Sequence, residues 1–394
     1  MKWEIAKLGD ISKNIQTGPF GSQLHQSDYS ECGIPVVMPK DLVGGKISEE
    51  SIARVDKTHV ERLCRHKIEV GDILYSRRGD VGRCAHVTKK EEGWLCGTGC
   101  LRVTIDSEKA DSRFVFFQLQ HPDTVGWVEK HAVGATMLNL NTTILSSVPI
   151  RLPALEIQKR IADILSAYDD LIENNQKQIK LLEEAAQRLY KEWFVDLRFP
   201  GHENTKVVDG VPEGWRKFPL EEIAPVVTGK KDANYGDKGG NYPFFTCSQE
   251  TITAPGYSFD TSAVILAGNG DFNVKLYRGK FEAYQRTYVL APFDHSNLFN
   301  LYFTVQDNME ALAKGASGST IKFLTKGMLQ KILVLTADKK VLDKFNDYEE
   351  NIQQKVEALK KQVEDLTEIR NRLLPKLMSG EVEVCHYGYA KRFL

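Results

Sequence analysis

No run of 18 consecutive apolar residues occurs in this chain of 394 residues, so no helix is expected to span a membrane. The first residues, Met1–Glu4, do not resemble the start of a signal peptide. The net charge is only −1, and a surface that binds nucleic acid would therefore need a local cluster of positive charge. These absences predict a cytoplasmic protein without a membrane partner.

Disulfides are not expected either. The seven cysteines are odd in number and scattered along the chain, which is typical of reduced thiols in a cytoplasm. Cysteines and histidines do gather between Cys64 and Cys100, and a metal site there is the alternative interpretation. Their spacings are not those of a zinc finger, so we predict that no metal is bound.

Catalytic motifs are missing as well. The sequence has no Walker loop, no carboxylate-plus-lysine cluster of a nuclease and no Asn/Asp-Pro-Pro-Tyr/Phe tetrad of an amino-methyltransferase, since Asn241–Phe245 contains only one proline. Gly268–Gly270 is a fragment of a glycine-rich cofactor loop or, as we prefer, a turn, because its counterpart earlier in the chain is Arg77–Gly79. We predict no catalytic residue and no cofactor in this chain.

An internal repeat is the most informative feature that is present. Gly134–Met137 aligns with Gly318–Ile321 at an offset of 184 residues, and the same offset carries Leu189 onto Leu373. Such self-similarity means that one structural unit is used twice. A chain of 394 residues with 42% hydrophobic and 27% charged residues also suits two globular domains.

Earlier landmarks repeat at wider offsets, so the second copy has shorter loops. Trp3 aligns with Trp215 at an offset of 212, and Ile73–Asp80 aligns with Val264–Asp271 at 191. In the first copy, β-type runs bounded by glycine or proline are expected at residues 34–38, 72–75 and 101–105, with a helix at 113–120.

Each copy ends in a long helix whose apolar residues follow steps of three and four. This spacing over four to five heptads is typical of a coiled coil. At about 1.5 Å per residue, a helix of about 35–40 residues is roughly 50–60 Å long. The expected seam residues are Ile161, Leu165, Ile172, Asn175, Ile179, Leu182 and Leu189 in the first helix and Val356, Leu359, Val363, Leu366 and Leu373 in the second.

These patterns predict an α+β fold with two similar mixed α/β domains, each followed by a long helix. The two helices are expected to pack as an antiparallel coiled coil with pseudo-two-fold symmetry. We place the boundaries at 1–153 for the first domain, 154–198 for the central helix, 199–337 for the second domain, 338–379 for the C-terminal helix and 380–394 for a tail.

A register for this coiled coil follows if Asn175 meets Leu359 at the axis. Glu349 would then face Ala185, and Arg370, opposite Ile164, would extend its charge to solvent. A polar seam residue generally fixes the register. The alternative is that Asn175 is merely tolerated at a seam position.

Three segments resemble those of one known family. Arg151–Ile161 resembles the beginning of the central conserved helix of type I restriction-modification specificity subunits, and Trp193–Gly201 resembles the end of that helix. Arg370–Glu381 resembles the usual end of the family's C-terminal helix. The second helix departs from the pattern at its start, where Leu335–Lys340 lacks the proline and the glutamine.

The resemblance implies a non-catalytic subunit that selects the DNA sequence for a larger enzyme. In this family each domain is a target-recognition domain that reads one half of a bipartite, asymmetric site in double-stranded DNA. The helices dock methyltransferase subunits, here expected to be two, which carry S-adenosylmethionine. Restriction subunits, which translocate DNA, join the full complex.

Residues that could contact DNA are cationic, amide and hydroxyl side chains, most of them in glycine-containing turns and loops. Solvated loops are the alternative interpretation for all of them. A weaker basic stretch, in which Lys275 and Arg278 are the preferred residues, continues to Lys280 and Arg286. The predicted contacts are Arg77, Arg78, Arg83, Thr136, Asn139, Asn141, Lys230, Lys231, Asn269, Lys275, Arg278, Ser319, Thr320 and Lys322.

Two other functions remain open from the sequence. One is a self-contained DNA-modifying methyltransferase or nuclease with an unrecognised active site, which would have to bind its own cofactor. The other is a coiled-coil scaffold with two protein-binding heads, which would not bind duplex DNA.

Overall fold

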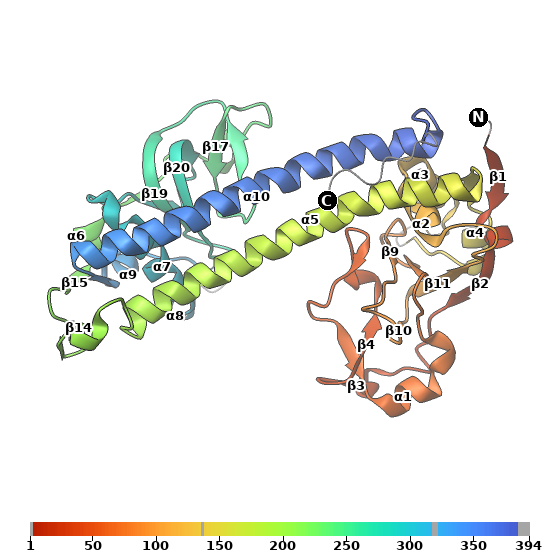
Figure 1. Cartoon of the computed structure of the whole chain (residues 1–394), viewed down its shortest axis with the longest axis horizontal. Coiled ribbons are helices and arrows are strands. Elements are labelled where there is room, and N and C mark those ends of the chain that lie inside the picture. Colours follow the sequence, from red (N-terminus) through yellow and green to blue (C-terminus); the bar gives the residue numbers. More distant parts are fainter. Residues whose placement is uncertain (1–2, 135–137, 317–321, 385–394) are drawn as a thin grey trace. The chain divides into compact units, whose positions relative to one another are not determined.

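The computed structural model describes residues 3–134, 138–316 and 322–384. The chain divides into two compact units, the first formed by residues 1–175 with 362–394 and the second by residues 176–361. Each unit therefore contains one domain and half of each long helix (Figure 1). No helix within the described ranges is both long and apolar enough to cross a membrane.

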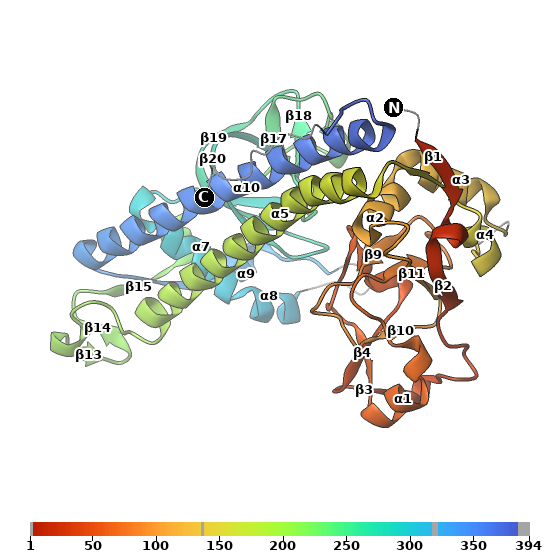
Figure 2. The same cartoon turned by 45° about the vertical axis from the view of Figure 1, so that its right-hand side comes forward.

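Three sheets form the main strand pairings of the first unit (Figure 2). Their strand orders are β2-β11-β8-β9, β10-β4-β7-β3 and β1-β12. The strands are β1 (Glu4–Lys7), β2 (Ser12–Thr17), β3 (Tyr29–Ser30), β4 (Ile34–Val37), β7 (Ala53–Val55), β8 (Ile73–Ser76), β9 (Cys84–His86), β10 (Leu95–Cys96), β11 (Cys100–Ile105) and β12 (Pro149–Leu152). A short pair, β5 (Leu42–Val43) and β6 (Lys46–Ile47), and helix α1 (Lys57–Arg62) complete this part.

Strand β8 is buried on both faces, which explains its uninterrupted apolar sequence. Because successive side chains of a strand point to opposite faces, Ile73 and Tyr75 enter one core and Leu74 another. The first core also contains Phe114 and Phe117 of helix α2 (Ser112–Gln120). Helices α3 (Pro122–His131) and α4 (Thr142–Ser146) follow α2 in the chain and contribute to the same core.

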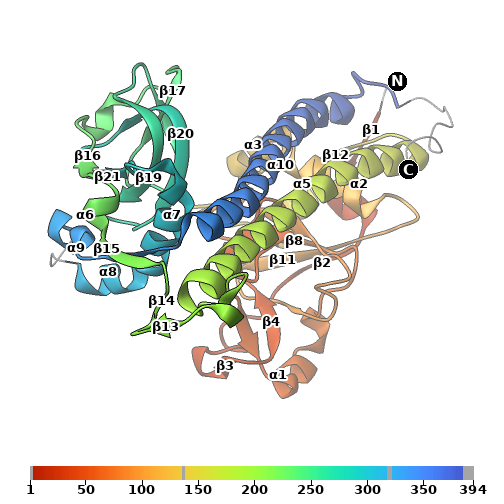
Figure 3. The ribbon, with the colours of Figure 1, turned by 60° about the vertical axis from the view of Figure 1, so that its left-hand side comes forward.

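The second unit is built around one six-stranded sheet of order β16-β21-β19-β20-β17-β18 (Figure 3). Two-stranded pairs β15-β22 and β13-β14 accompany it. The strands are β13 (Val207–Val208), β14 (Val211–Pro212), β15 (Arg216–Pro219), β16 (Val226–Thr228), β17 (Tyr242–Phe245), β18 (Ile252–Ala254), β19 (Phe259–Ala267), β20 (Val274–Ala283), β21 (Thr287–Leu290) and β22 (Leu333–Thr336). The short helices are α6 (Leu220–Ile223), α7 (Leu298–Asp307), α8 (Met309–Gly315) and α9 (Lys326–Gln330).

Residues that pair in the β-strands of the first sequence copy have equivalents that also pair in the second copy. Glu4 pairs with Leu152 in the β1-β12 sheet, and Arg216 pairs with Thr336 in the β15-β22 sheet, at the offsets of 212 and 184 that the sequence gives. The strand order β2-β11-β8-β9 recurs as β16-β21-β19-β20. The predicted fold class, two similar mixed α/β domains each followed by a long helix, is confirmed.

The two long helices are α5 (Leu155–Tyr190), which continues as a π-helix at Lys191–Val195, and α10 (Lys339–Ser379). In the first unit, the start of α5 packs on the end of α10, where Ile161 shares a core with Leu377. In the second unit, the end of α5 packs on the start of α10, where Trp193 shares a core with Phe345. The helices are thus antiparallel within each unit, and all the predicted seam residues are buried or half-buried.

The polar contacts of the seam differ from the predicted register. The Asn175 side-chain amide donates to the Gln362 side chain at 3.2 Å, three residues beyond the expected Leu359. The expected extension of Arg370 to solvent is wrong, because its guanidinium forms an ion pair with Asp169 at 2.6 Å.

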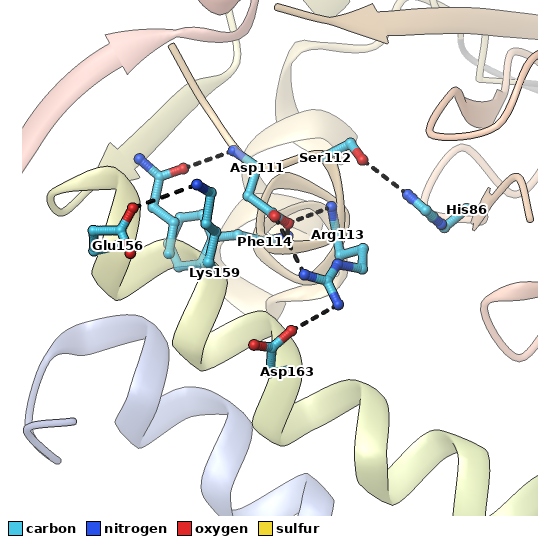
Figure 4. Close-up of polar contacts among 9 residues, drawn as sticks. His86, Asp111, Ser112, Arg113, Phe114, Glu156, Lys159 and Asp163 are labelled. Carbon is cyan, nitrogen blue, oxygen red and sulfur yellow. Dashed lines mark hydrogen bonds and ion pairs between the residues drawn. The ribbon is translucent and has the colours of Figure 1, made fainter. Parts of the chain in front are cut away.

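Polar contacts join the start of α5 to the first domain (Figure 4). Arg113 of α2 forms ion pairs with Asp111 at 3.3 Å and with Asp163 of α5 at 2.8 Å. Gln158, only 2% exposed, accepts a hydrogen bond from the Asp111 backbone amide at 3.0 Å. Its counterpart in the second copy is Leu342, which lies in an apolar core, so the departure of that helix from the family motif replaces a polar junction with an apolar one.

Candidate nucleic-acid interface

Backbone hydrogen bonds join two of the predicted DNA-contacting segments in the first unit. The Leu140 amide donates to the Arg77 carbonyl at 2.8 Å, and the Gly79 amide donates to the Leu138 carbonyl at 3.1 Å. Arg78 and Asn139 therefore form an isolated antiparallel bridge. The turn after β8 and the loop before α4, about 60 residues apart in sequence, become neighbouring parts of one surface.

The three arginines of this turn have different environments. Arg78 is exposed, and among the described residues its side chain forms no ion pair. Arg77 is half-buried and its Nε has no hydrogen-bond partner in the described structure. Arg83 forms an ion pair with Asp80 at 2.6 Å within its own turn. Arg78 is consequently the arginine most available to a ligand.

The amide side chains of the neighbouring loop also differ. Asn139 is exposed, so its side chain remains available. Asn141 caps α4, since its Oδ1 accepts the Ile144 backbone amide at 2.8 Å. Thr136, another predicted contact, lies outside the described residues.

The second unit contains the same arrangement. The Leu324 amide donates to the Gly268 carbonyl at 2.8 Å. Asn269 and Phe323 form an isolated antiparallel bridge, as Arg78 and Asn139 do in the first unit. Asn269 is half-buried and Lys322 is exposed. The predicted contacts Ser319 and Thr320 lie outside the described residues.

A third segment, which no sequence pattern marks, completes this arrangement in both units. It is the turn that precedes β11 or β21, where the Gly99 carbonyl accepts the Arg77 amide at 2.8 Å and the Arg286 carbonyl accepts the Gly268 amide at 2.9 Å. We call the three hydrogen-bonded segments the recognition frame. In the first unit it comprises residues 77–79, 138–140 and 97–100, and in the second it comprises residues 268–270, 322–324 and 284–287.

Glycine is required directly after β2 and directly after β16, because the third segment or the residue before it approaches closely there. A Cβ on Gly18 would lie 2.0 Å from the Gly97 carbonyl oxygen, and a Cβ on Gly229 would lie 1.9 Å from that of Ala283. Both distances are far below van der Waals contact, so neither position accepts a side chain without movement of the backbone. The Thr-Gly pairs that the sequence repeats, at residues 17–18 and 228–229, are therefore explained by packing.

The frame of the second unit borders a hollow of about 330 Å³. Gln285 and Arg286 are exposed there, and Phe323 is 38% exposed. The Tyr288 hydroxyl donates to the Leu324 carbonyl at 3.0 Å. Gln285 and Phe323 carry no sequence signal of their own, because only the fold brings them to the hollow beside Gly268. The lining residues are Thr228, Gly268, Gln285, Arg286, Tyr288, Phe323 and Leu324.

The remaining predicted contacts lie elsewhere in the second unit. Lys230 is exposed, and the Lys231 ammonium lies 4.3 Å from the centre of the Tyr235 ring. Lys275 donates to the Ser248 carbonyl at 2.8 Å, and burial lowers the pKa of its amine. Arg278 forms an ion pair with Glu350 of α10 at 2.7 Å. Lys275 and Arg278 thus have partners within the unit, and their contact with DNA stays a prediction.

Cys84, Cys96 and Cys100 of the cysteine- and histidine-containing stretch are buried. Burial raises the pKa of the Cys84 and Cys96 thiols to about 12, and it raises that of Cys100 as well. Burial also lowers the pKa of His86 to about 4. A thiol must lose its proton to bind a metal, so these environments oppose coordination. In the ranges that the structure describes, no group of three or more His, Cys, Asp or Glu residues is arranged to hold a metal ion.

Two domains of one fold, each with the same main-chain frame but different exposed side chains, define a class of protein that is built from an internal repeat. The family described as "Type I restriction modification DNA specificity domain" matches residues 1–184 and 212–365. The chain therefore belongs to the family of type I restriction-modification specificity subunits, as its motifs predicted. The prediction of a non-catalytic specificity subunit is confirmed by this membership.

Individual relatives agree with the family assignment. The chain is 26% identical to the type I restriction enzyme MjaIX specificity subunit of Methanocaldococcus jannaschii, over 97% of this chain and 94% of that protein. It is 37% identical to the EcoDI specificity subunit of Escherichia coli, over 44% of this chain and 39% of that protein. The crystal structure of an S subunit from M. genitalium has the same fold, with a TM-score of 0.65, 17% identity and coverage of 95% of this chain and 96% of that one.

Proposed function

We propose that this chain reads a bipartite, asymmetric site in double-stranded DNA, with one half-site recognised by each domain. The observation that carries the proposal is the recognition frame, which has the same backbone bonds in both units and different side chains. An unchanged frame suits a constant docking geometry on duplex DNA, whereas changed side chains suit different base sequences.

The exposed side chains of the two frames are of the kinds that read base edges. Arginine donates two hydrogen bonds to the O6 and N7 atoms of guanine, and asparagine or glutamine pairs in the same way with adenine. Arg78 and Asn139 in the first frame and Gln285 and Arg286 in the second are exposed and offer these groups, and the half-buried Asn269 offers a further amide. The net charge of −1 is compatible with this function because the cations lie in local turns.

The proposal includes partner subunits that bind the helices. Leu171, Leu181 and Ile369 are large apolar side chains that lie outside the seam and are 50%, 55% and 44% exposed. We assign these exposed positions to contacts with methyltransferase subunits, two for each chain, which would supply the S-adenosylmethionine. Restriction subunits would join through them, and the complex would act on DNA in the cytoplasm.

Substitution of Arg78 tests the reading of one half-site. Arg78→Ala is expected to cost about 1–3 kcal/mol of discrimination at one base pair, because two hydrogen bonds to a base edge are lost. The other half-site should be read as before. Competition mobility-shift assays at fixed salt, with duplexes that each change one base pair of the target, measure this effect.

The control is Arg151→Ala, which removes another exposed arginine, from β12 outside the frame. This variant should bind every duplex as the unchanged chain does. If Arg78→Ala instead weakens all duplexes equally, Arg78 contacts a phosphate and not a base.

A further inference from the structure

Matching hydrogen bonds allow the two recognition frames to be compared residue by residue. Arg78 corresponds to Asn269, because each forms an isolated antiparallel β-bridge with the loop segment of its own unit. Gly99 corresponds to Arg286, because each carbonyl accepts the amide at the start of the neighbouring turn. The second frame therefore presents its arginine on a different segment from the first, and the amide side chain of Asn269 occupies the place of Arg78.

The backbone that carries Arg286 is fixed from several sides. Its carbonyl accepts hydrogen bonds from the Gly268 amide at 2.9 Å and from the Cys247 thiol at 3.5 Å. The Gln285 amide donates to the Lys231 carbonyl at 2.9 Å, and the Thr287 amide donates to the Tyr284 carbonyl at 2.8 Å. A side chain on a fixed turn is presented in a reproducible direction, which a base-reading contact needs.

Among the residues that the structure describes, no side chain competes for the Arg286 guanidinium. The side chain is exposed, and within the described part of the chain it forms no ion pair. Lys275 and Arg278 of the same basic stretch are engaged by Ser248 and Glu350. Of these three cations, Arg286 alone borders the hollow of the second frame.

The hollow around Arg286 combines the groups that contact base edges. Gln285 and Thr228 offer amide and hydroxyl groups, and Phe323 offers an exposed apolar ring. An aromatic or methyl group beside a base edge contacts the thymine methyl, whereas the forked guanidinium suits guanine. Hydroxyl and amide groups can also contact a phosphate, but the Phe323 ring would contribute nothing to a phosphate site.

We propose that Arg286 is the specificity-determining residue of the second domain and reads a guanine through its O6 and N7 atoms. This inference rests on the proposed function and names the group that carries it out in the second half-site. Because the arginine occupies a different segment in each frame, the guanines read by Arg78 and Arg286 should hold different positions within their half-sites.

The test is to replace the gene of this chain in its own host with variants and to sequence the methylated sites of the genome. The variants are Arg286→Ala, Arg286→Lys, Arg78→Ala and the control Arg216→Ala, whose exposed arginine lies on β15 outside the frame. The unchanged chain supplies the reference motif. Competition binding by the full complex then measures discrimination at each position.

We expect Arg286→Ala to relax one G·C position, in the half-site that Arg78→Ala leaves intact, with discrimination there falling roughly 5- to 150-fold. Arg286→Lys should relax the same position, because an ammonium keeps the charge but not the fork. Arg216→Ala should leave the motif unchanged. An unchanged motif for Arg286→Ala, or a fully retained motif for Arg286→Lys, overturns the inference while the proposed function stands.

Failure of the proposed function gives a different result. If the unchanged chain produces no bipartite motif in its host, the reading of two half-sites is wrong, whatever Arg286 does. Equal weakening of all duplexes by both Arg286 variants would assign the residue to a phosphate and would also overturn the inference.

Discussion

Glu349→Leu is expected to stabilise the second unit by about 3 kcal/mol at pH 7. Glu349 is fully buried in the seam, and neither carboxyl oxygen has a hydrogen-bond partner in the described structure. Burial raises the pKa of this carboxyl from 4.5 to about 8. The equivalent position in the first copy is Leu165, which is also fully buried, so the fold accommodates leucine at this place in the repeat.

The effect depends on pH in a defined direction. In the unfolded chain the Glu349 carboxyl ionises near pH 4.5, whereas in the folded chain it stays neutral up to about pH 8. The unfolded state is therefore favoured by about 1.4 kcal/mol per pH unit across this window, and stability falls as the pH rises. Tyr302 lies close by, but burial, together with Glu183 and Glu349, raises the pKa of its hydroxyl to about 12, so it stays neutral throughout.

Chemical denaturation at pH 5, 7 and 8 measures this difference. Glu349→Gln keeps the shape and removes the titration, so its advantage over the unchanged chain should grow steadily with pH. Glu357→Leu, at an exposed position of α10, is the matched control and should change stability by less than about 0.5 kcal/mol. A constant difference between the unchanged chain and Glu349→Gln at all three pH values would contradict the prediction.

Phe345→Ala and Ile161→Ala, at equivalent positions of the two copies, are expected to destabilise different units. Phe345 is fully buried, and its ring centre lies 4.9 Å from that of Phe194 and 5.8 Å from that of Trp193. Its loss should cost about 3–5 kcal/mol in the second unit, and loss of the Ile161 side chain about 2–5 kcal/mol in the first. Their apolar cores are separate, so each effect should stay within its own unit.

Hydrogen exchange followed by mass spectrometry of peptides locates these effects. Phe345→Ala should lower protection mainly in residues 176–361, and Ile161→Ala mainly in the remainder. Phe345→Leu retains most of the buried surface and should be intermediate. The same loss of protection in both units for both variants would show that the two cores do not unfold separately.

The long helices were the most predictable part of the molecule. Their heptad spacing depends only on which residues are apolar, and every predicted seam residue is buried or half-buried. The register was not predictable to the residue, because Asn175 and Arg370 bond to polar groups that lie beside the seam. Hydrophobic spacing does not record such partners.

The candidate site was only partly predictable. The sequence identified the turn at Arg78 and the loop at Asn139, but it could not separate Asn141, which caps a helix, from an amide that faces a ligand. The third segment of each frame was not predictable, since its link to the others is a backbone hydrogen bond that any residue can make. Phe323 joins the site for the same reason, without a chemical signature of its own.

The backbone nature of the recognition frame has an evolutionary consequence. The hydrogen bonds that hold its segments together use amides and carbonyls, so selection for a new DNA target can replace side chains without loss of folding stability. Gly99 is an exception, because its φ of +93° disfavours other residues. Adaptation of the first domain should therefore proceed through positions 78 and 139, whereas the second domain can also vary at position 286.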